Sequence, residues 1–152
     1  MTTIAPQMIT PAALVDVLAG LYEAEQASIF RFMQPGNTYL TRATVELRDQ
    51  VEEMSRTTER HTAELGRLIE DLGGVAHAAR LGAENQYLAY LSLKFLIPKL
   101  ANAKRDAIQR YQNAIKATKG GASEEVKGLL DAHLADHKND LDTLQRAAAL
   151  TR

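Results

Sequence analysis

One repeat runs without a break through residues 39–72 and constrains the fold more than any other feature of the sequence. Its members recur at alternating intervals of three and four residues, the spacing of one face of an α-helix. They are Leu40, Thr44, Leu47, Val51, Met54, Thr58, His61, Leu65, Leu68 and Leu72. A long helix with such a face buries it most readily against other long helices. The repeat therefore predicts a helical bundle.

Turn-forming residues divide the chain into four segments of this kind. A Pro-Gly pair and two Gly-Gly pairs mark helix ends, at 35–36, 73–74 and 120–121. The predicted helices span about 11–34, 39–72, 84–118 and 123–151. Since no alternating, β-branched stretch of strand length occurs, the predicted class is all-α, with one domain over residues 1–152.

The connection between the second and third helices, roughly residues 73–83, is the longest one predicted. Its length permits a crossover along the bundle instead of a tight hairpin. Pro98 lies inside the third helix and predicts a kink there. Pro98 also leaves open a shift of register that would turn Lys104 outward.

The charge balance and composition exclude several classes of function. With 18 basic and 19 acidic side chains, the chain indicates neither nucleic acid nor an anionic membrane as a partner. It has no cysteine, and therefore no thiolate metal site. Its start lacks the pattern of a secretory signal, and its most apolar stretch, YLAYLSLKFLIPKL, is too short to span a bilayer. We expect a cytoplasmic protein, able to form a homo-oligomer such as a dimer through the bundle surface.

The other three helices carry core-facing rows of the same spacing. The row of the first helix contains Leu14, Leu18, Leu21, Glu25, Ile29 and Phe32. That of the third contains Ile97, Ala101, Lys104, Ile108, Tyr111 and Ile115. That of the fourth contains Val126, Leu130, His133, His137, Asp140 and Leu144.

Polar residues interrupt all four rows. They are Glu25, Thr58, His61, Lys104, His133, His137 and Asp140. Glu25 and Thr58 are 58 − 25 = 33 residues apart, and Lys104 and His137 are 137 − 104 = 33 apart. Another polar core-facing residue follows three residues after Thr58 and three after His137. This weak internal repeat predicts that the polar positions meet at one level of the bundle, where His133 is a core histidine one turn away.

At these residues the sequence resembles the ferritin-like superfamily, and the bacterioferritins in particular. The stretches LYEAEQASIF, TERHTAELGRLIEDLGG and LADHKNDLDTL resemble that family's motifs on helices one, two and four. The family binds two metal ions with a Glu on helix one, a Glu-x-x-His on helix two, a Glu on helix three and a Glu-x-x-His on helix four. The resemblance implies a ferritin-like four-helix bundle with a long crossover between helices two and three.

The departures from the family pattern fall on the ligand positions themselves. These positions hold Glu25, Thr58, His61, Lys104, His137 and Asp140, of which only the first and third keep the family residue. Lys104 matters most, because a protonated amine repels a metal ion and has no lone pair to offer. The resemblance therefore implies a degenerate di-iron site. Neither ferroxidase activity nor iron storage is expected.

Charge counting limits the site to one metal ion at most. The family site balances four carboxylates with two divalent ions, whereas these positions hold two carboxylates and one lysine, a sum of −1 with neutral histidines. One divalent ion would bring the sum to +1, and protonation of one histidine would bring it to zero without metal. Burying an uncompensated charge costs on the order of several kcal/mol per ion. Since the site can reach a sum of zero without a metal ion, it can do without any metal.

Two hypotheses follow for the function. In the first, the bundle binds no cofactor, and a buried salt bridge between Lys104 and Glu25 replaces the metal, with His61, His137 and Asp140 completing the hydrogen bonds. By analogy of fold alone, such a protein has a non-enzymatic structural or stress-related role.

In the second hypothesis, Glu25, His61 and His137 bind one Fe, Mn or Zn ion, as two-histidine, one-carboxylate sets do. Asp140 is then a fourth ligand, or it orients one of the histidines. Such a metal-binding site could carry oxygen or peroxide chemistry.

Overall fold

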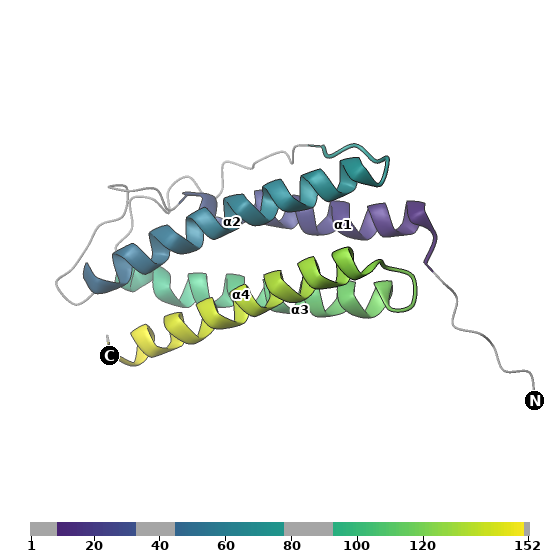
Figure 1. The fold of residues 1–152 in the computed structure, drawn as a ribbon. Helices are drawn as coiled ribbons and strands as arrows, with labels where there is room; N and C mark the ends of the chain where they lie inside the picture. Colours follow the sequence, from purple (N-terminus) through teal and green to yellow (C-terminus); the bar gives the residue numbers. More distant parts are fainter. Residues whose placement is uncertain (1–8, 33–44, 78–92, 151–152) are drawn as a thin grey trace, which may run out of the picture.

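The computed structural model describes residues 9–32, 45–77 and 93–150, and these ranges contain four long helices (Figure 1). The elements are α1 (Pro11–Gln26), the short 3-10 helix η1 (Ile29–Phe32), α2 (Val45–Asp71), α3 (Leu93–Thr118) and α4 (Glu124–Leu150). The same ranges contain no strand, so the predicted all-α class with four helices is confirmed. The predicted helical residues 39–44 and 84–92, and most of the predicted crossover, lie outside the described residues.

The four long helices lie side by side as two pairs (Figure 1). α1 packs chiefly on α2 and α3 chiefly on α4, while contacts from α1 to α3 and from α2 to α4 close the bundle. α2 and α3 run in the same direction, opposite to α1 and α4 (Figure 1). None of the helices in the described ranges has both the length and the apolarity needed to cross a membrane.

Capping residues explain where these helices begin and end. Thr10 Oγ1 accepts a hydrogen bond from the Ala13 amide at 3.1 Å, with Pro11 in the first turn of α1. Ser123 Oγ accepts one from the Val126 amide at 3.3 Å at the start of α4. After α2 and α3 the chain turns at Gly73 and Gly120, whose φ angles of 85° and 93° favour glycine.

Two apolar clusters fill the bundle, one toward each end, and a polar layer lies between them. One cluster contains Leu14, Leu18, Leu21, Leu65, Leu68, Ile69, Tyr111, Ala114, Val126 and Leu130. The other contains Phe30, Leu47, Val51, Met54, Leu96, Ile97, Leu100, Ala101 and Leu144. The buried polar residues at intermediate positions along the helices are Glu25, Thr58, His61, Lys104, His133 and His137.

The first helix is shorter than the predicted 11–34. α1 ends at Gln26, and the chain continues into η1, where the Arg31 guanidinium donates to the Gln26 carbonyl oxygen at 3.2 Å. This tighter turn changes which side chain faces the core: Phe30 is 1% exposed, whereas the predicted Ile29 is only partly buried. The predicted Phe32 side chain lies outside the described residues.

The row predicted for the second helix is wrong at its end. Leu72 is 37% exposed, because α2 ends at Asp71 and the chain turns at Gly73. Leu40 and Thr44, at the start of that row, lie outside the described residues.

Candidate functional site

Glu25 is the centre of the polar layer. Its side chain is 4% exposed, and its Oε1 accepts hydrogen bonds from Tyr111 Oη at 2.9 Å, His137 Nε2 at 2.7 Å and His61 Nδ1 at 3.3 Å. The three donors come from α3, α4 and α2, so this one oxygen joins all four helices. Burial alone would raise the pKa of Glu25, but the hydrogen bonds from His137 and His61 hold it well below its usual range.

Tyr111 connects Glu25 to His133 through two hydrogen bonds. The phenol has one proton and gives it to Glu25, so its oxygen accepts a hydrogen bond from His133 Nδ1 at 3.0 Å. Burial, followed by the negative charge of Glu25, raises the pKa of Tyr111 and keeps the phenol protonated. Burial lowers the pKa of His133 to about 3, so its imidazole is neutral, with its proton on Nδ1.

His61 lies between two carboxylates and is fully buried. Its Nδ1 faces Glu25, and its Nε2 is 2.8 Å from Asp136 Oδ2. Both contacts are hydrogen bonds when both ring nitrogens carry a proton. Arg60 Nη2 also donates to Asp136 Oδ2, at 2.6 Å, and the ring of His61 stacks on that of His133 with centroids 3.8 Å apart.

Lys104 lies in the core, 1% exposed, although Pro98 precedes it in the same helix. Its Nζ is 3.1 Å from His137 Nδ1 and 2.9 Å from Asp140 Oδ2, and 4.3 Å from the centroid of the Phe30 ring. The contact with Asp140 is an ion pair by distance only, because Asp140 Oδ2 has no partner in hydrogen-bond geometry.

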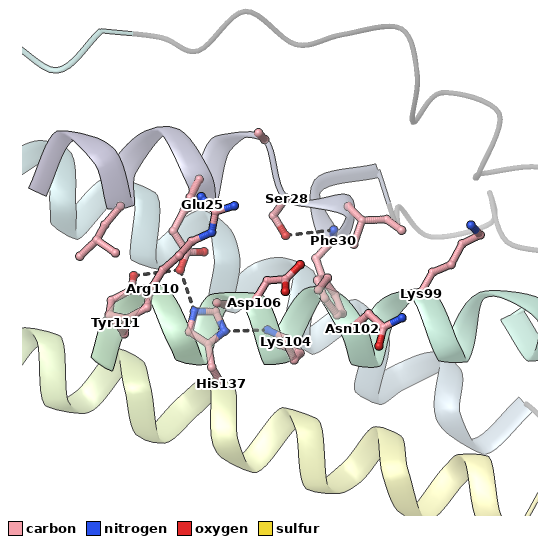
Figure 2. A pocket seen from close by; sticks show the side chains of 16 residues that line it. Glu25, Ser28, Phe30, Lys99, Asn102, Lys104, Asp106, Arg110, Tyr111 and His137 are labelled. Carbon is pink, nitrogen blue, oxygen red and sulfur yellow. Dashed lines mark hydrogen bonds and ion pairs between the residues drawn. The ribbon is translucent and has the colours of Figure 1, made fainter. Parts of the chain in front are cut away.

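The ammonium of Lys104 determines the tautomer of His137. An ammonium has hydrogen-bond donors but no acceptor, so His137 Nδ1 must accept, and the ring proton is on Nε2, donated to Glu25. Burial lowers the pKa of His137; the hydrogen bond to Glu25 opposes this shift and the charge of Lys104 adds to it. Figure 2 shows His137 between Glu25 and Lys104 in this chain of contacts.

Most of the polar positions predicted from the sequence meet in one network, with two differences. The predicted Lys104–Glu25 salt bridge is wrong: within the described residues no ion pair joins them, because the His137 ring lies between. Thr58 is buried at the predicted level, but its hydroxyl donates to the Met54 carbonyl oxygen at 3.0 Å on its own helix. Thr58 therefore does not join the network.

The outer members of the network were not among the residues predicted from the sequence. Asp136, with a side chain 34% exposed, precedes His137 on the flank of α4, where a row of core positions cannot identify it. Its partners Arg60 and His61 are 76 and 75 residues away in sequence. An acidic residue next to two core histidines on a helix was the only signal available. Asp140, predicted to face the core, is 20% exposed.

A pocket of about 440 Å³ opens beside the network between α1, η1 and α3 (Figure 2). Glu25, Lys104, Tyr111 and His137 contribute to its lining. All four are buried residues of the network, so the pocket borders the network on this side of the bundle.

Among the described residues, Glu25, His61 and His137 form a group of three that could hold a metal ion, and their ligand atoms lie within 4.8 Å of one another. Asp136 contacts the second nitrogen of His61, as carboxylates do behind metal-binding histidines. However, Glu25 Oε1 and His137 Nε2 are at a hydrogen-bond distance of 2.7 Å. Two ligands about 2.1 Å from a tetrahedral ion would be roughly 3.4 Å apart. Glu25 and His137 must therefore move apart before the three residues can bind an ion.

Comparison with known proteins adds no family assignment. The sequence matches no protein-family model, and no curated protein matches it either. The function is therefore inferred from the buried network itself.

Proposed function

We propose that this protein is a ferritin-like four-helix bundle in which a buried charge network replaces the metal ions, and that its role is structural and not enzymatic. The sequence motifs, the polar layer contributed by all four helices and the common direction of α2 and α3 support the ferritin-like fold (Figure 1). That common direction also favours a crossover between α2 and α3. A cytoplasmic, stress-related role is proposed by analogy of fold.

One observation carries the proposal: the contact of 3.1 Å between Lys104 Nζ and His137 Nδ1. It keeps a proton on His137 Nε2, the nitrogen that faces Glu25. A metal ion bound there would displace that proton to Nδ1, where an N–H would face an ammonium with no acceptor between them. Metal binding therefore requires Lys104 to lose a proton or to move away.

The charges of the network nearly balance without a metal ion. Four carboxylates, Glu25, Glu64, Asp136 and Asp140, face three cations, Lys104, Arg60 and a His61 that carries a proton on both ring nitrogens. The sum is 3 − 4 = −1. A divalent ion added to this set would leave uncompensated positive charge next to Lys104, which is unfavourable in a buried layer.

A second function is a mononuclear metal protein, and the carboxylate of Asp136 on His61 Nε2 favours it. Glu25, His61 and His137 would hold the ion. A bound Fe or Mn ion would supply oxygen or peroxide chemistry, with Zn an alternative occupant. Asp136 would keep His61 oriented with Nδ1 toward the ion, and the pocket between α1 and α3 would admit small molecules.

The test compares the wild type with Glu25→Gln, both purified without added metal. Metal content is measured directly, and thermal melts are recorded with Fe(II), Mn(II), Zn(II) and chelator. If the network binds no metal, the metal content and the thermal response to metal or chelator should be the same in the wild type and in Glu25→Gln. A stoichiometric metal, or a chelator-sensitive Tm, that is present in the wild type and lost in Glu25→Gln would overturn the proposal in favour of the mononuclear site.

A further inference from the structure

The buried ring of His133 has a nitrogen that the network leaves unused. Its Nδ1 donates to Tyr111 Oη, so in the neutral ring Nε2 has no proton and carries a lone pair. His133 is 1% exposed, and its Nε2 has no hydrogen-bond partner among the described residues. A buried acceptor without a partner is unfavourable, and a bound cation or hydrogen-bond donor would remove that cost.

The atom opposite this lone pair is also an acceptor. Glu64 Oε2, on α2, lies 3.7 Å from His133 Nε2, and the Glu64 side chain is 41% exposed. A carboxylate oxygen and an unprotonated imidazole nitrogen repel each other unless a cation or a hydrogen-bond donor lies between them. The pair thus forms a site for a positive group at the surface between α2 and α4.

Arg60 forms ion pairs with the two carboxylates beside this site, those of Glu64 and Asp136. Its Nε is 3.3 Å from Glu64 Oε1, and its Nη2 is 2.6 Å from Asp136 Oδ2. Glu64 Oε2 is the carboxylate oxygen left facing His133. The negative charges of Glu25 and Asp136 favour a cation at His133, whereas His61, which stacks on the ring, opposes it.

We propose that His133 Nε2 and Glu64 Oε2 bind a divalent transition-metal ion of the Zn(II) type, whose other positions are filled by water. An ion about 2.1 Å from each atom would subtend roughly 124° at these two ligands, which is within reach of small side-chain adjustments. An imidazole ligand favours Zn(II) over Mg(II) or Ca(II), which prefer oxygen. This site is separate from the Glu25, His61 and His137 group, because it uses the ring nitrogen of His133 that points away from Tyr111.

Titration calorimetry of the full chain with ZnCl2 tests the inference on Glu64→Gln and a matched control, Glu52→Gln. Glu52 is also on α2 and also accepts from an arginine four residues earlier, with Arg48 Nε at 3.1 Å. We expect one Zn(II) per chain in the wild type and in Glu52→Gln, and affinity at least about tenfold weaker in Glu64→Gln. Excess Mg(II) should not compete. In nitrogen NMR spectra, Zn(II) should shift His133 Nε2 and leave the exposed His77 unchanged.

Three outcomes would overturn the inference, and they separate it from the proposed function. If the wild type binds no Zn(II), the gap at His133 holds only water, and the metal-free network stands. If Glu64→Gln and Glu52→Gln bind Zn(II) equally well, Glu64 is not a ligand. If binding is lost in Glu25→Gln and kept in Glu64→Gln, the ion is in the interior group, and both proposals fail.

Discussion

Among single residues, Lys104 has the widest effect on the chemistry of the site, because it decides which nitrogen of His137 carries the proton. The ammonium fills a position that would otherwise favour a cation, and its contacts with His137 and Asp140 leave it well compensated. Removal of that charge should change metal affinity more than any change at the pocket edge.

Lys104→Glu removes the ammonium and adds a carboxylate beside Asp140 and His137. We expect the affinity for Mn(II), measured by titration calorimetry, to rise at least about tenfold over the wild type. The control is Lys99→Glu, which makes the same charge change at an exposed position of α3 that also lines the pocket. Equal Mn(II) affinity in the two variants would show that Lys104 does not exclude the metal.

The neutral, buried His133 makes stability depend on pH. Its pKa is lowered from 6.5 to about 3, so between these values the unfolded chain binds more protons than the folded one. Stability is therefore full above pH 6.5 and falls with pH by up to about 1.4 kcal/mol per unit. Below pH 4.5 the lowered pKa of Glu25 adds a loss of the same sign.

Urea unfolding at several pH values measures this slope in the wild type, His133→Gln and the control His77→Gln, which changes an exposed histidine. We expect the decline between neutral pH and pH 5 to become shallower in His133→Gln alone. A wild-type slope retained in His133→Gln would mean that other groups cause the acid sensitivity.

The sequence predicts which residues enter the polar layer but not how they pair. Glu25, His61 and Lys104 interrupt apolar rows, and burial follows directly from those rows. The tautomer of His137 depends on a lysine 33 residues away, and Asp136 lies on a helix flank, so neither follows from periodicity. The predicted Lys104–Glu25 salt bridge fails for the same reason: opposite charge at one level does not specify contact.

Among the helices and their connections, some glycines leave room for a side chain and others do not. Gly128 lies inside α4, and a Cβ added there meets nothing within 4 Å. At Gly121, between α3 and α4, an added Cβ would lie 2.8 Å from the backbone nitrogen of Ile9.

Gly128→Ala should therefore raise the free energy of unfolding by about 0.5–1 kcal/mol, because alanine restricts the unfolded chain and favours the helix. Gly121→Ala should lower it, since the start of the described chain must move. Urea unfolding of both variants checks these signs. Stabilisation by Gly121→Ala would show that Ile9 does not pack on this turn.

The presence of each helix was easier to predict from the sequence than the residue at which it ends. The rows of α2, α3 and α4 mark their helices because apolar spacing is maintained over many turns. The end of α1 is set by local bonds, including the one from Arg31 to the Gln26 carbonyl, and these carry no signal in hydrophobic spacing. In η1 the buried side chain is that of Phe30, which the predicted row did not include.

In the molecule as a whole, the polar layer joins four helices between two apolar clusters. The all-α class was predictable because each helix carries its own core-facing row. The net charge of the network was not, because Arg60, Glu64 and Asp136 contribute to it from outside the rows. Whether this layer can bind a metal ion therefore depends on which of its nitrogen and oxygen atoms carry protons.

Nitrogen NMR of the histidine rings in the full chain near neutral pH tests this most directly, because long-range couplings identify the protonated nitrogen of each ring. The metal-free network predicts that His137 is protonated on Nε2 with a bare Nδ1, and that chelator leaves this pattern unchanged. A bare or metal-bound Nε2 on His137, or a pattern that changes when chelator is added, would contradict it.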